Sequence, residues 1–252
     1  MRPRILVTRP AGQSGELVAL LRDRGFASTG IPTIEVDTDG CIADVDAMLD
    51  GLDGAAWLIL TSANGARSVV SRLRATGTRL PPELRVAAVG PATAESLRTS
   101  GIVVDHVPTT YLTSAIADGL GHLDGQRVVL ARADAASPEL RARLDERGAR
   151  VEEVIAYRTV EAPAASRDAL RAALHDDLAG ITFTSASAVR GLMRLAAAVD
   201  RPRARATPAF CIGPVAAEQA RHSGFNVAAV AGEHTASGLA DAIAGHFARE
   251  DR

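Results

Sequence analysis

Short apolar runs alternate with longer amphipathic stretches along most of the chain. RILVT precedes SGELVALLRDRG, AWLILTS precedes ARSVVSRLRATG, and RVAAVG precedes ATAESLRTSG. Runs such as WLIL, VVLA and GITF have no polar side, which is typical of parallel strands that helices cover on both faces. The pattern therefore predicts an α/β fold in which each half of the chain forms about five strands with intervening helices, as a small doubly wound parallel sheet of flavodoxin-like type.

The two halves of the chain repeat one pattern at a constant distance. VGPATAESLRTSG at 89–101 is similar to IGPVAAEQARHSG at 212–224, and TSANGARSV at 61–69 is similar to TSASAVRGL at 184–192. In both cases the second copy begins 123 residues after the first (212 minus 89, and 184 minus 61). Because insertions are most easily tolerated in loops, a distance kept across several loops indicates two domains related by internal duplication.

Length and composition are those of an ordinary globular protein. The 252 residues are 47% hydrophobic and 23% charged, which together with the repeat favours two domains of ordinary size. The net charge of −2 provides no basic field, so we expect neither nucleic acid nor a membrane surface as a partner. We expect a cytoplasmic protein, since no run is long enough for a signal peptide or a membrane span. Cys41 and Cys211 lack metal-binding spacing, so no metal site is predicted.

Polar residues and glycines gather where the predicted strands end. Ligands of an open parallel sheet bind at the carboxyl ends of its strands, where helix N-termini present free amide groups. The candidate binding residues at these strand ends are Arg9, Thr61, Ser62, Asn64, Gly90, Thr184, Ser185, Ser187 and Gly213. Serine and asparagine also cap helices that bind nothing, so each residue alone has a structural explanation. Occurring twice, the set predicts two facing edges that form a cleft for carboxylates or phosphates.

No catalytic motif stands out, because the chain has no Walker loop, no Gly-x-Gly-x-x-Gly and no nucleophile elbow. We interpret the six histidines as surface residues and the arginine-rich stretch at 200–208 as an exposed loop. The copies differ in chemical type at Tyr157, which stands 123 residues after Ile34. A phenol with a pKa of about 10 can donate a proton or a hydrogen bond to a departing oxygen. Packing at a domain junction explains Tyr157 equally well.

Several short motifs together resemble the uroporphyrinogen-III synthase family. They are ILVTRP, LILTSANGARSV, AAVGPATAESLRTSG, VIAYRTV, TFTSASAV and CIGPVAAEQARHSGFNV followed by AGEHTASGLADAI. Each motif is short, but their order and spacing cover about residues 4–245. Family members often have a proline after such a strand-end serine, whereas this chain has Ala63 and Ala186.

The resemblance implies two flavodoxin-like domains joined by two extended linkers. One domain is discontinuous and consists of residues 1–35 and 160–252, and the other consists of residues 36–159. The 123-residue distance alone suggests a different division, with a cut near residue 123. Both divisions are compatible with the same repeat, since the first βαβ units of the two copies can be exchanged.

The resemblance also implies the activity, which is cyclisation of the linear tetrapyrrole hydroxymethylbilane to uroporphyrinogen III with loss of water and inversion of ring D. This small-molecule substrate is a polycarboxylate, and the family uses no metal or organic cofactor. By resemblance, Tyr157 is the candidate catalytic acid, Thr235 lies in the last cleft loop, and the pairs at 61–62 and 184–185 are strand-end residues. We expect the protein to act as a monomer.

Two other classes of protein fit parts of the sequence. A non-catalytic tetrapyrrole-sensing or regulatory module of the same fold is the main alternative, and it is expected beside an output domain such as a basic winged helix. A two-lobed small-molecule binding protein of periplasmic type is the second, and it is expected to carry a signal peptide. Since neither companion segment is evident in the sequence, we favour the enzyme.

Overall fold

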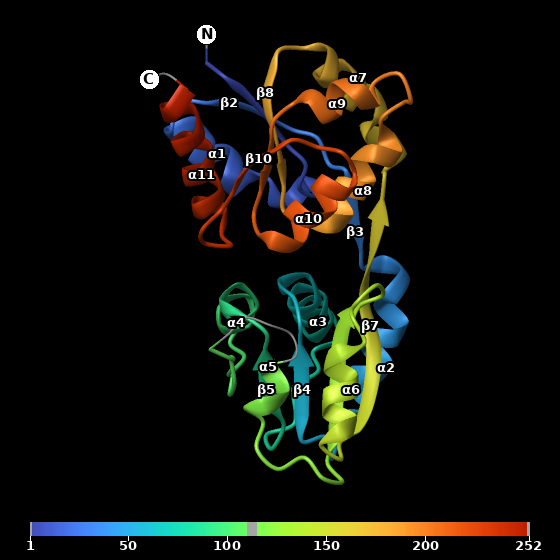
Figure 1. Ribbon diagram of the computed structural model, residues 1–252. Helices are drawn as coiled ribbons and strands as arrows, with labels where there is room; N and C mark the ends of the chain where they lie inside the picture. Colours follow the sequence, from blue (N-terminus) through green and yellow to red (C-terminus); the bar gives the residue numbers. More distant parts are fainter. Residues whose placement is uncertain (1, 110–114, 251–252) are drawn as a thin grey trace. The chain divides into compact units, whose positions relative to one another are not determined.

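The computed structural model describes residues 2–109 and 115–250, and the chain forms two compact units (Figure 1). Unit 1 consists of Met1–Glu35 and Val160–Arg252, and unit 2 consists of Val36–Thr159. Unit 1 is therefore assembled from both ends of the chain. Within the described ranges, no helix is both long and apolar enough to cross a membrane.

The sheet of unit 1 has the strand order β10-β9-β8-β1-β2, and its four ladders are parallel. Its strands are β1 (Arg4–Val7), β2 (Ala27–Gly30), β8 (Leu178–Phe183), β9 (Ala209–Cys211) and β10 (Val227–Val230). Its helices are α1 (Gly15–Asp23), α7 (Arg167–His175), α8 (Ala186–Leu195), α9 (Arg201–Ala206), α10 (Pro214–His222) and α11 (Ala236–Glu250), with short 3-10 turns at Ala11–Gln13 and Ala164–Ser166. Numbered along the unit, this is the 2-1-3-4-5 order of flavodoxin-like sheets.

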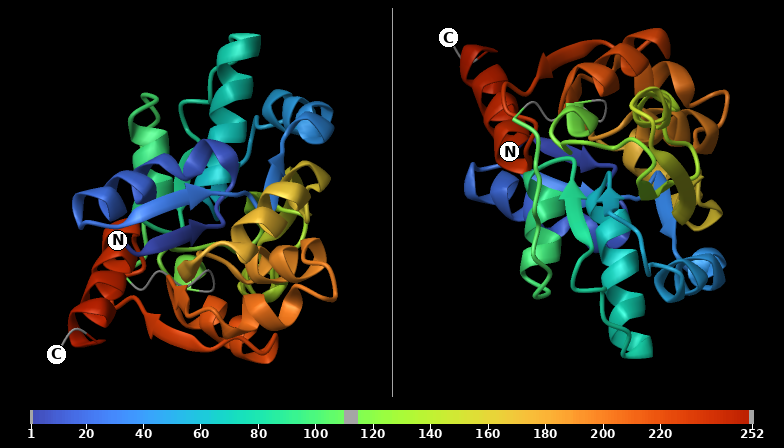
Figure 2. Two further views of the ribbon diagram at one scale, coloured as in Figure 1. Left: turned by 90° about the horizontal axis from the view of Figure 1, so that it is seen from above. Right: turned by 90° about the horizontal axis from the view of Figure 1, so that it is seen from below.

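Alternate residues of the interior strand β1 point to opposite faces of this sheet. Ile5 and Val7 pack against α1 and α11, whereas Leu6 packs with the cluster formed by α7, α8, α9 and α10. Helices α1 and α11 lie side by side on the face to which Ile5 and Val7 point (Figure 1). Figure 2 shows the molecule from above and from below. Because both faces of β1 are covered, its sequence is a continuous apolar run, as the pattern predicted.

The sheet of unit 2 has the strand order β3-β7-β6-β4-β5, with parallel ladders from β7 through β6 and β4 to β5. Its strands are β3 (Ile34–Asp37), β4 (Trp57–Leu60), β5 (Arg85–Ala88), β6 (Arg127–Ala133) and β7 (Arg150–Glu161). Its helices are α2 (Ile42–Asp50), α3 (Ala63–Thr76), α4 (Pro91–Arg98), α5 (Ala115–Asp118) and α6 (Glu139–Glu146), with a 3-10 turn at Asp39–Cys41. Leu58 and Leu60 face α2, α3 and α4, and Ile59 faces α5 and α6.

The two sheets have the same register, displaced by 123 residues. Leu6 pairs with Ile181 in unit 1, and Val129, which is 123 residues after Leu6, pairs with Leu58, which is 123 residues before Ile181. The β1–β2 ladder matches the β6–β7 ladder in the same way, and the β8–β9 ladder matches the β4–β5 ladder. Strands β1 and β2 thus complete the sheet of the C-terminal half, and a cut near residue 123 would separate them from β8.

His106 is half-buried, so the interpretation of all six histidines as surface residues was wrong. Its backbone forms an isolated parallel bridge with Ala87. The two residues 123 positions later form a pair in the β9–β10 ladder. A Cβ on Gly119 would lie 2.0 Å from the His106 ring, and burial lowers the pKa of this histidine. His246 is half-buried as well, with its ring edge-on to Phe210 at 5.2 Å between centroids.

The stretch at 200–208 contains helix α9, so its interpretation as an exposed loop was also wrong. Pro202 lies in the first turn of α9, where the amide it lacks would have no partner within the helix. Ala204 is fully buried in the core of unit 1, and the neighbouring arginines are exposed. A six-residue helix with one buried position has no apolar periodicity that sequence analysis can detect.

Candidate functional site

The carboxyl end of β4 leads directly into α3 through Thr61 and Ser62. Ser62 has an extended backbone (φ −156°, ψ 155°), and its Oγ accepts a hydrogen bond from the Gly65 amide at 3.1 Å. This N-cap satisfies one amide of the first turn and leaves earlier ones directed beyond the edge of the sheet. In the same turn the Asn64 side chain accepts a hydrogen bond from the exposed Arg67 guanidinium. Helix amides and a cation at one position suit an anionic group.

The carboxyl end of β5 leads into α4 without a side-chain cap. Gly90 is the N-cap residue, with an extended backbone (φ −163°, ψ 174°), and Pro91 occupies the start of the helix. Proline lacks an amide at a position where the amide would have no intrahelical partner. The other first-turn amides of α4 are oriented as hydrogen-bond donors at the same edge as the Ser62 cap.

Tyr157 lies in the carboxyl-terminal part of β7, beside the first turn of α3. Its side chain is 7% exposed and belongs to the core cluster on the α3 side of the sheet. A Cβ on Gly65 would lie 3.8 Å from Cε1 of Tyr157, which places the ring against the capped turn. The candidate acid and the Ser62 cap therefore occupy one edge of unit 2.

Unit 1 has the same cap at the carboxyl end of β8. Ser185 follows Thr184, has an extended backbone (φ −161°, ψ 160°), and accepts a hydrogen bond from the Ala188 amide at 3.1 Å through Oγ. The Oγ atoms of Ser185 and Ser187 are 2.9 Å apart and share a second hydrogen bond. Two hydroxyl groups thus lie in the first turn of α8.

The last two loops of unit 1 meet at Gly213 and His234, next to Thr235. Gly213 is the N-cap residue of α10, and a Cβ there would lie 3.2 Å from Cδ2 and Nε2 of His234. Thr235 accepts a hydrogen bond from the Gly238 amide at 3.0 Å through Oγ1, which caps α11. Sequence analysis did not identify His234 as a residue of this edge, although its place next to Thr235 was an available signal. A Cβ on Gly238 would lie 2.3 Å from the Glu233 carbonyl oxygen, so this turn requires glycine.

Arg9 follows β1 at the edge of unit 1 and is half-buried. The preceding Thr8 is fully buried, and its Oγ1 donates to the Thr182 carbonyl at 2.6 Å, which fixes the backbone next to Arg9. Arg132, 123 residues after Arg9, is 6% exposed and donates to a Glu153 carboxylate oxygen at 2.8 Å. Arg132 is therefore a structural residue of unit 2, whereas Arg9 stays a candidate for binding a carboxylate because of its place after β1.

Candidate residues from distant parts of the chain are brought together by each sheet. Unit 2 holds Thr61, Ser62, Asn64, Gly90 and Tyr157, and unit 1 holds Arg9, Thr184, Ser185, Ser187, Gly213 and Thr235. Each set lies at the carboxyl ends of parallel strands, where the sequence predicted a ligand. Among the described residues, no group of three or more His, Cys, Asp and Glu side chains is placed to hold a metal ion.

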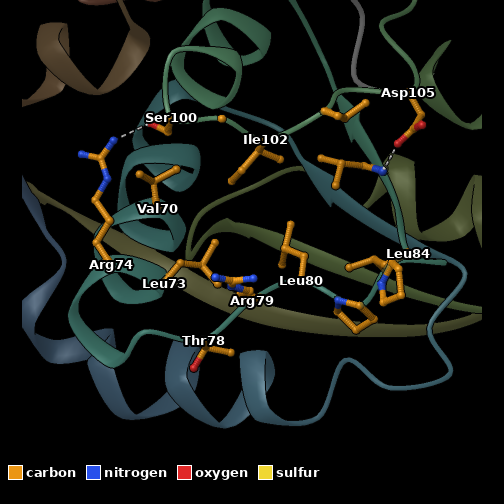
Figure 3. A pocket seen from close by; sticks show the side chains of 15 residues that line it. Val70, Leu73, Arg74, Thr78, Arg79, Leu80, Leu84, Ser100, Ile102 and Asp105 are labelled. Carbon is orange, nitrogen blue, oxygen red and sulfur yellow. Dashed lines mark hydrogen bonds between the residues drawn. The ribbon is translucent and has the colours of Figure 1, made fainter.

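A pocket of about 570 Å³ lies at another part of unit 2 (Figure 3). The side chains of Val70, Leu73, Leu80 and Ile102 line it, and Arg74 at its margin donates to the Ser100 hydroxyl at 3.2 Å. These residues come from the C-terminal part of α3 and the segments that precede β5 and follow α4. The pocket contains none of the candidate site residues.

The fold and the two strand-end edges define a class of protein: an α/β protein of two doubly wound units, each with helix N-termini at the carboxyl edge of its sheet. The family model described as "Uroporphyrinogen-III synthase HemD" matches residues 15–241. The chain therefore belongs to the uroporphyrinogen-III synthase family.

Similar proteins agree with this assignment. The chain is 32% identical to the uroporphyrinogen-III synthase of Synechococcus elongatus over 95% of its length and 93% of the relative's. It is 31% identical to the porphyrin biosynthesis protein HemD of Ruminiclostridium josui over 86% of its length, which spans 44% of that longer protein.

Solved structures share the fold. A mutant uroporphyrinogen III synthase from Thermus thermophilus superimposes with a TM-score of 0.67 at 19% identity, covering 98% of this chain and 99% of that one. The enzyme from Helicobacter pylori superimposes with a TM-score of 0.60 at 15% identity, covering 100% of both chains.

Proposed function

We propose that this protein is an enzyme that cyclises hydroxymethylbilane to uroporphyrinogen III, with loss of water and inversion of ring D. The observation that carries the proposal is the match to the family model over residues 15–241. The relatives' names refer to the synthase or to porphyrin biosynthesis, so we do not retain a regulatory module as an alternative.

The substrate is a polycarboxylate, and the two strand-end edges supply groups that bind carboxylates. Five helices, α3, α4, α8, α10 and α11, begin at these edges. Their first-turn amides, the hydroxyl groups of Ser62, Ser185, Ser187 and Thr235, and the Arg9 guanidinium bind anions without a large net positive charge. This local binding is consistent with a net charge of −2 for the whole chain.

Tyr157 is the proposed general acid. Its phenol donates a proton to the hydroxyl group of ring A, which departs as water, and loss of the ring A N–H proton completes the electrophilic azafulvene. Ring D attacks the electrophilic carbon of the azafulvene through its own substituted carbon. The resulting spiro intermediate fragments and closes again with ring D inverted. The enzyme's main task is to hold the chain of rings so that the substituted carbon attacks, because productive orientation supplies much of the rate enhancement of such a step.

We propose that the two units are the two domains of the enzyme and that they arose by duplication with exchange of their first βαβ segments. The identical register of the paired ladders supports this origin. The proposed enzyme acts as a cytoplasmic monomer without a metal or organic cofactor.

The function is tested by incubating purified, metal-stripped protein with freshly made hydroxymethylbilane and separating the isomers formed. We expect the type III isomer in excess, with no added cofactor. Hydroxymethylbilane closes to the type I isomer by itself, so a heat-denatured sample provides the background. Formation of type I alone would refute the activity, and loss of activity with a chelator would refute the cofactor-free mechanism.

A further inference from the structure

Strand β7 contains an irregularity immediately before Tyr157. In the β6–β7 ladder, Arg132 pairs with Ile155 and the next residue, Ala133, pairs with Tyr157, so Ala156 is an extra residue in β7. Successive residues of a regular strand point to opposite faces of the sheet. Ala156 and Tyr157 nevertheless belong to the same core cluster, on the α3 side. The bulge at Ala156 therefore turns the Tyr157 side chain toward α3.

Ser68 of α3 holds this bulge. Its Oγ donates a hydrogen bond to the Ala156 carbonyl at 2.6 Å, and both residues are buried, with exposures of 4% and 0%. A buried carbonyl without a donor is costly, so the serine hydroxyl stabilises this backbone conformation. Ser68 and Gly65 are three residues apart in α3 and therefore lie on the same face of the helix. This face packs against the Tyr157 ring at Gly65.

Unit 1 lacks this arrangement at the corresponding position. Gly191 stands 123 residues after Ser68, and a Cβ on it would lie 2.0 Å from the Thr33 carbonyl oxygen. That carbonyl accepts its hydrogen bond from the Ala162 amide at 3.0 Å instead. The residue after Thr33 is Ile34, the counterpart of Tyr157. The serine is thus present in unit 2, which has the tyrosine, and absent from unit 1, to which Ile34 belongs although β3 continues into unit 2.

We propose that Ser68 is a positioning residue for the reaction: through the Ala156 carbonyl it fixes the bulge in β7 and so sets the direction of the Tyr157 phenol. This inference rests on the proposed function, in which Tyr157 donates the proton. In this role Ser68 acts through the backbone at Ala156.

Removal of the hydroxyl in Ser68→Ala is expected to lower kcat about 10- to 100-fold with little change in KM, because a small misplacement of an acid affects the chemical step more than binding. In a Tyr157→Phe background the same substitution is expected to change kcat less than about twofold, since the donor is already gone. Thr182→Val is the matched control, because it removes another buried hydroxyl that donates to a carbonyl, that of Leu6 at 3.2 Å, in unit 1. We expect near-normal kcat for this control. Equal losses of kcat in Ser68→Ala and Thr182→Val, or additive losses with Tyr157→Phe, would overturn the proposal.

A spectroscopic measurement separates this inference from the proposed function. The chain has two tyrosines, so protein labelled with 3-fluorotyrosine gives two ¹⁹F signals, and Tyr157→Phe assigns one of them. Ser68→Ala is expected to shift or broaden the Tyr157 signal, whereas Thr182→Val leaves it unchanged. If Ser68→Ala does not fold, Ser68→Cys, which keeps a weak donor of similar size, replaces it with a smaller expected shift. An unmoved signal refutes the positioning role even in an active enzyme, whereas a moved signal without type III product refutes only the reaction.

Discussion

The strand-end edges of units 1 and 2 are closely similar. Ser62 and Ser185 have nearly the same backbone angles, and the Oγ of each accepts a hydrogen bond at 3.1 Å from the amide three residues later. Gly90 and Gly213 each precede a proline at the start of a helix. The units differ where β7 carries Tyr157 and the corresponding position is Ile34. The shared features are those of an anion-binding scaffold, and the difference marks the group to which we assign the chemistry.

A second difference lies away from these edges. In unit 1, α9 covers the core through Ala204, whereas in unit 2 the residue 123 positions earlier is Pro81, followed by Pro82. Consecutive prolines in the middle of this segment prevent a helix, because each lacks an amide and clashes with the preceding turn. The segment lines the pocket in Figure 3 instead. The repeat therefore preserves the strand-end caps and also diverges at this segment, which holds none of the candidate site residues.

The largest expected effect concerns the exchanged strands. Residues 1–123 expressed alone contain β1 without β8 and β4 without β6, which leaves one edge of each of these interior strands with unpaired backbone groups. We expect no cooperative unfolding transition for this fragment, and a sharp transition for 36–159, which contains β4, β5 and β6 whole, β7 up to Thr159 and the last two residues of β3. Chemical denaturation monitored by circular dichroism tests both fragments. A sharp transition for 1–123 would contradict the proposed domains.

The next largest effect is expected for Tyr157→Phe. This change keeps the ring against Gly65 and removes only the proposed acid, so turnover should fall about 10²- to 10⁴-fold, or roughly 3–5 kcal/mol in the barrier, with an unchanged melting temperature. The fraction of type I isomer should rise, since spontaneous closure competes. Initial rates and isomer ratios measure this, and Tyr157→Ala serves as the comparison that also loses packing. A Phe variant within threefold of the wild-type rate would remove Tyr157 from the mechanism.

Gly191→Ala is expected to destabilise unit 1 by about 2–3 kcal/mol, because the new Cβ has to displace the Thr33 carbonyl. Gly15→Ala is the matched control, since α1 offers open space at that position and the substitution favours the helix. The midpoints of urea denaturation report both effects. A stability of Gly191→Ala equal to that of the wild type would show that unit 1 tolerates a side chain where unit 2 has Ser68.

The smallest effects are expected at the caps. Ser62→Ala and Ser185→Ala each remove one side-chain acceptor from a helix N-terminus, so each should lower the free energy of unfolding by about 1 kcal/mol. Isomer analysis of the same variants shows which cap also contributes to binding, through a rise in KM. Unequal losses of stability would show that the two caps differ in energy although their geometry is nearly the same.

Much of the fold was predictable because apolar runs and helix-capping residues are local signals. The runs around Leu58 and Leu6 predicted buried parallel strands, and Ser62 and Ser185 were recognised as caps. The bulge at Ala156 and the role of Ser68 were not predictable, since neither an inserted residue in a strand nor a mid-helix serine has a distinctive pattern. The helical state of α9 and the burial of His106 depend on what packs against each segment, and local sequence does not record this.

The sequence by itself determined the α/β class, the 123-residue repeat and the family resemblance, because these depend on residue types at fixed distances along the chain. Only the tertiary structure decided which copies of the strands pair. Exchanging β1 and β2 for β6 and β7 leaves every local pattern and every spacing unchanged. The partner of β1 therefore follows from packing between residues more than 170 positions apart in the chain. The hydrogen bond from the Thr8 hydroxyl to the Thr182 carbonyl is one such contact. Tyr157 likewise reaches the Ser62 edge only because a strand and a helix distant in sequence meet in one core.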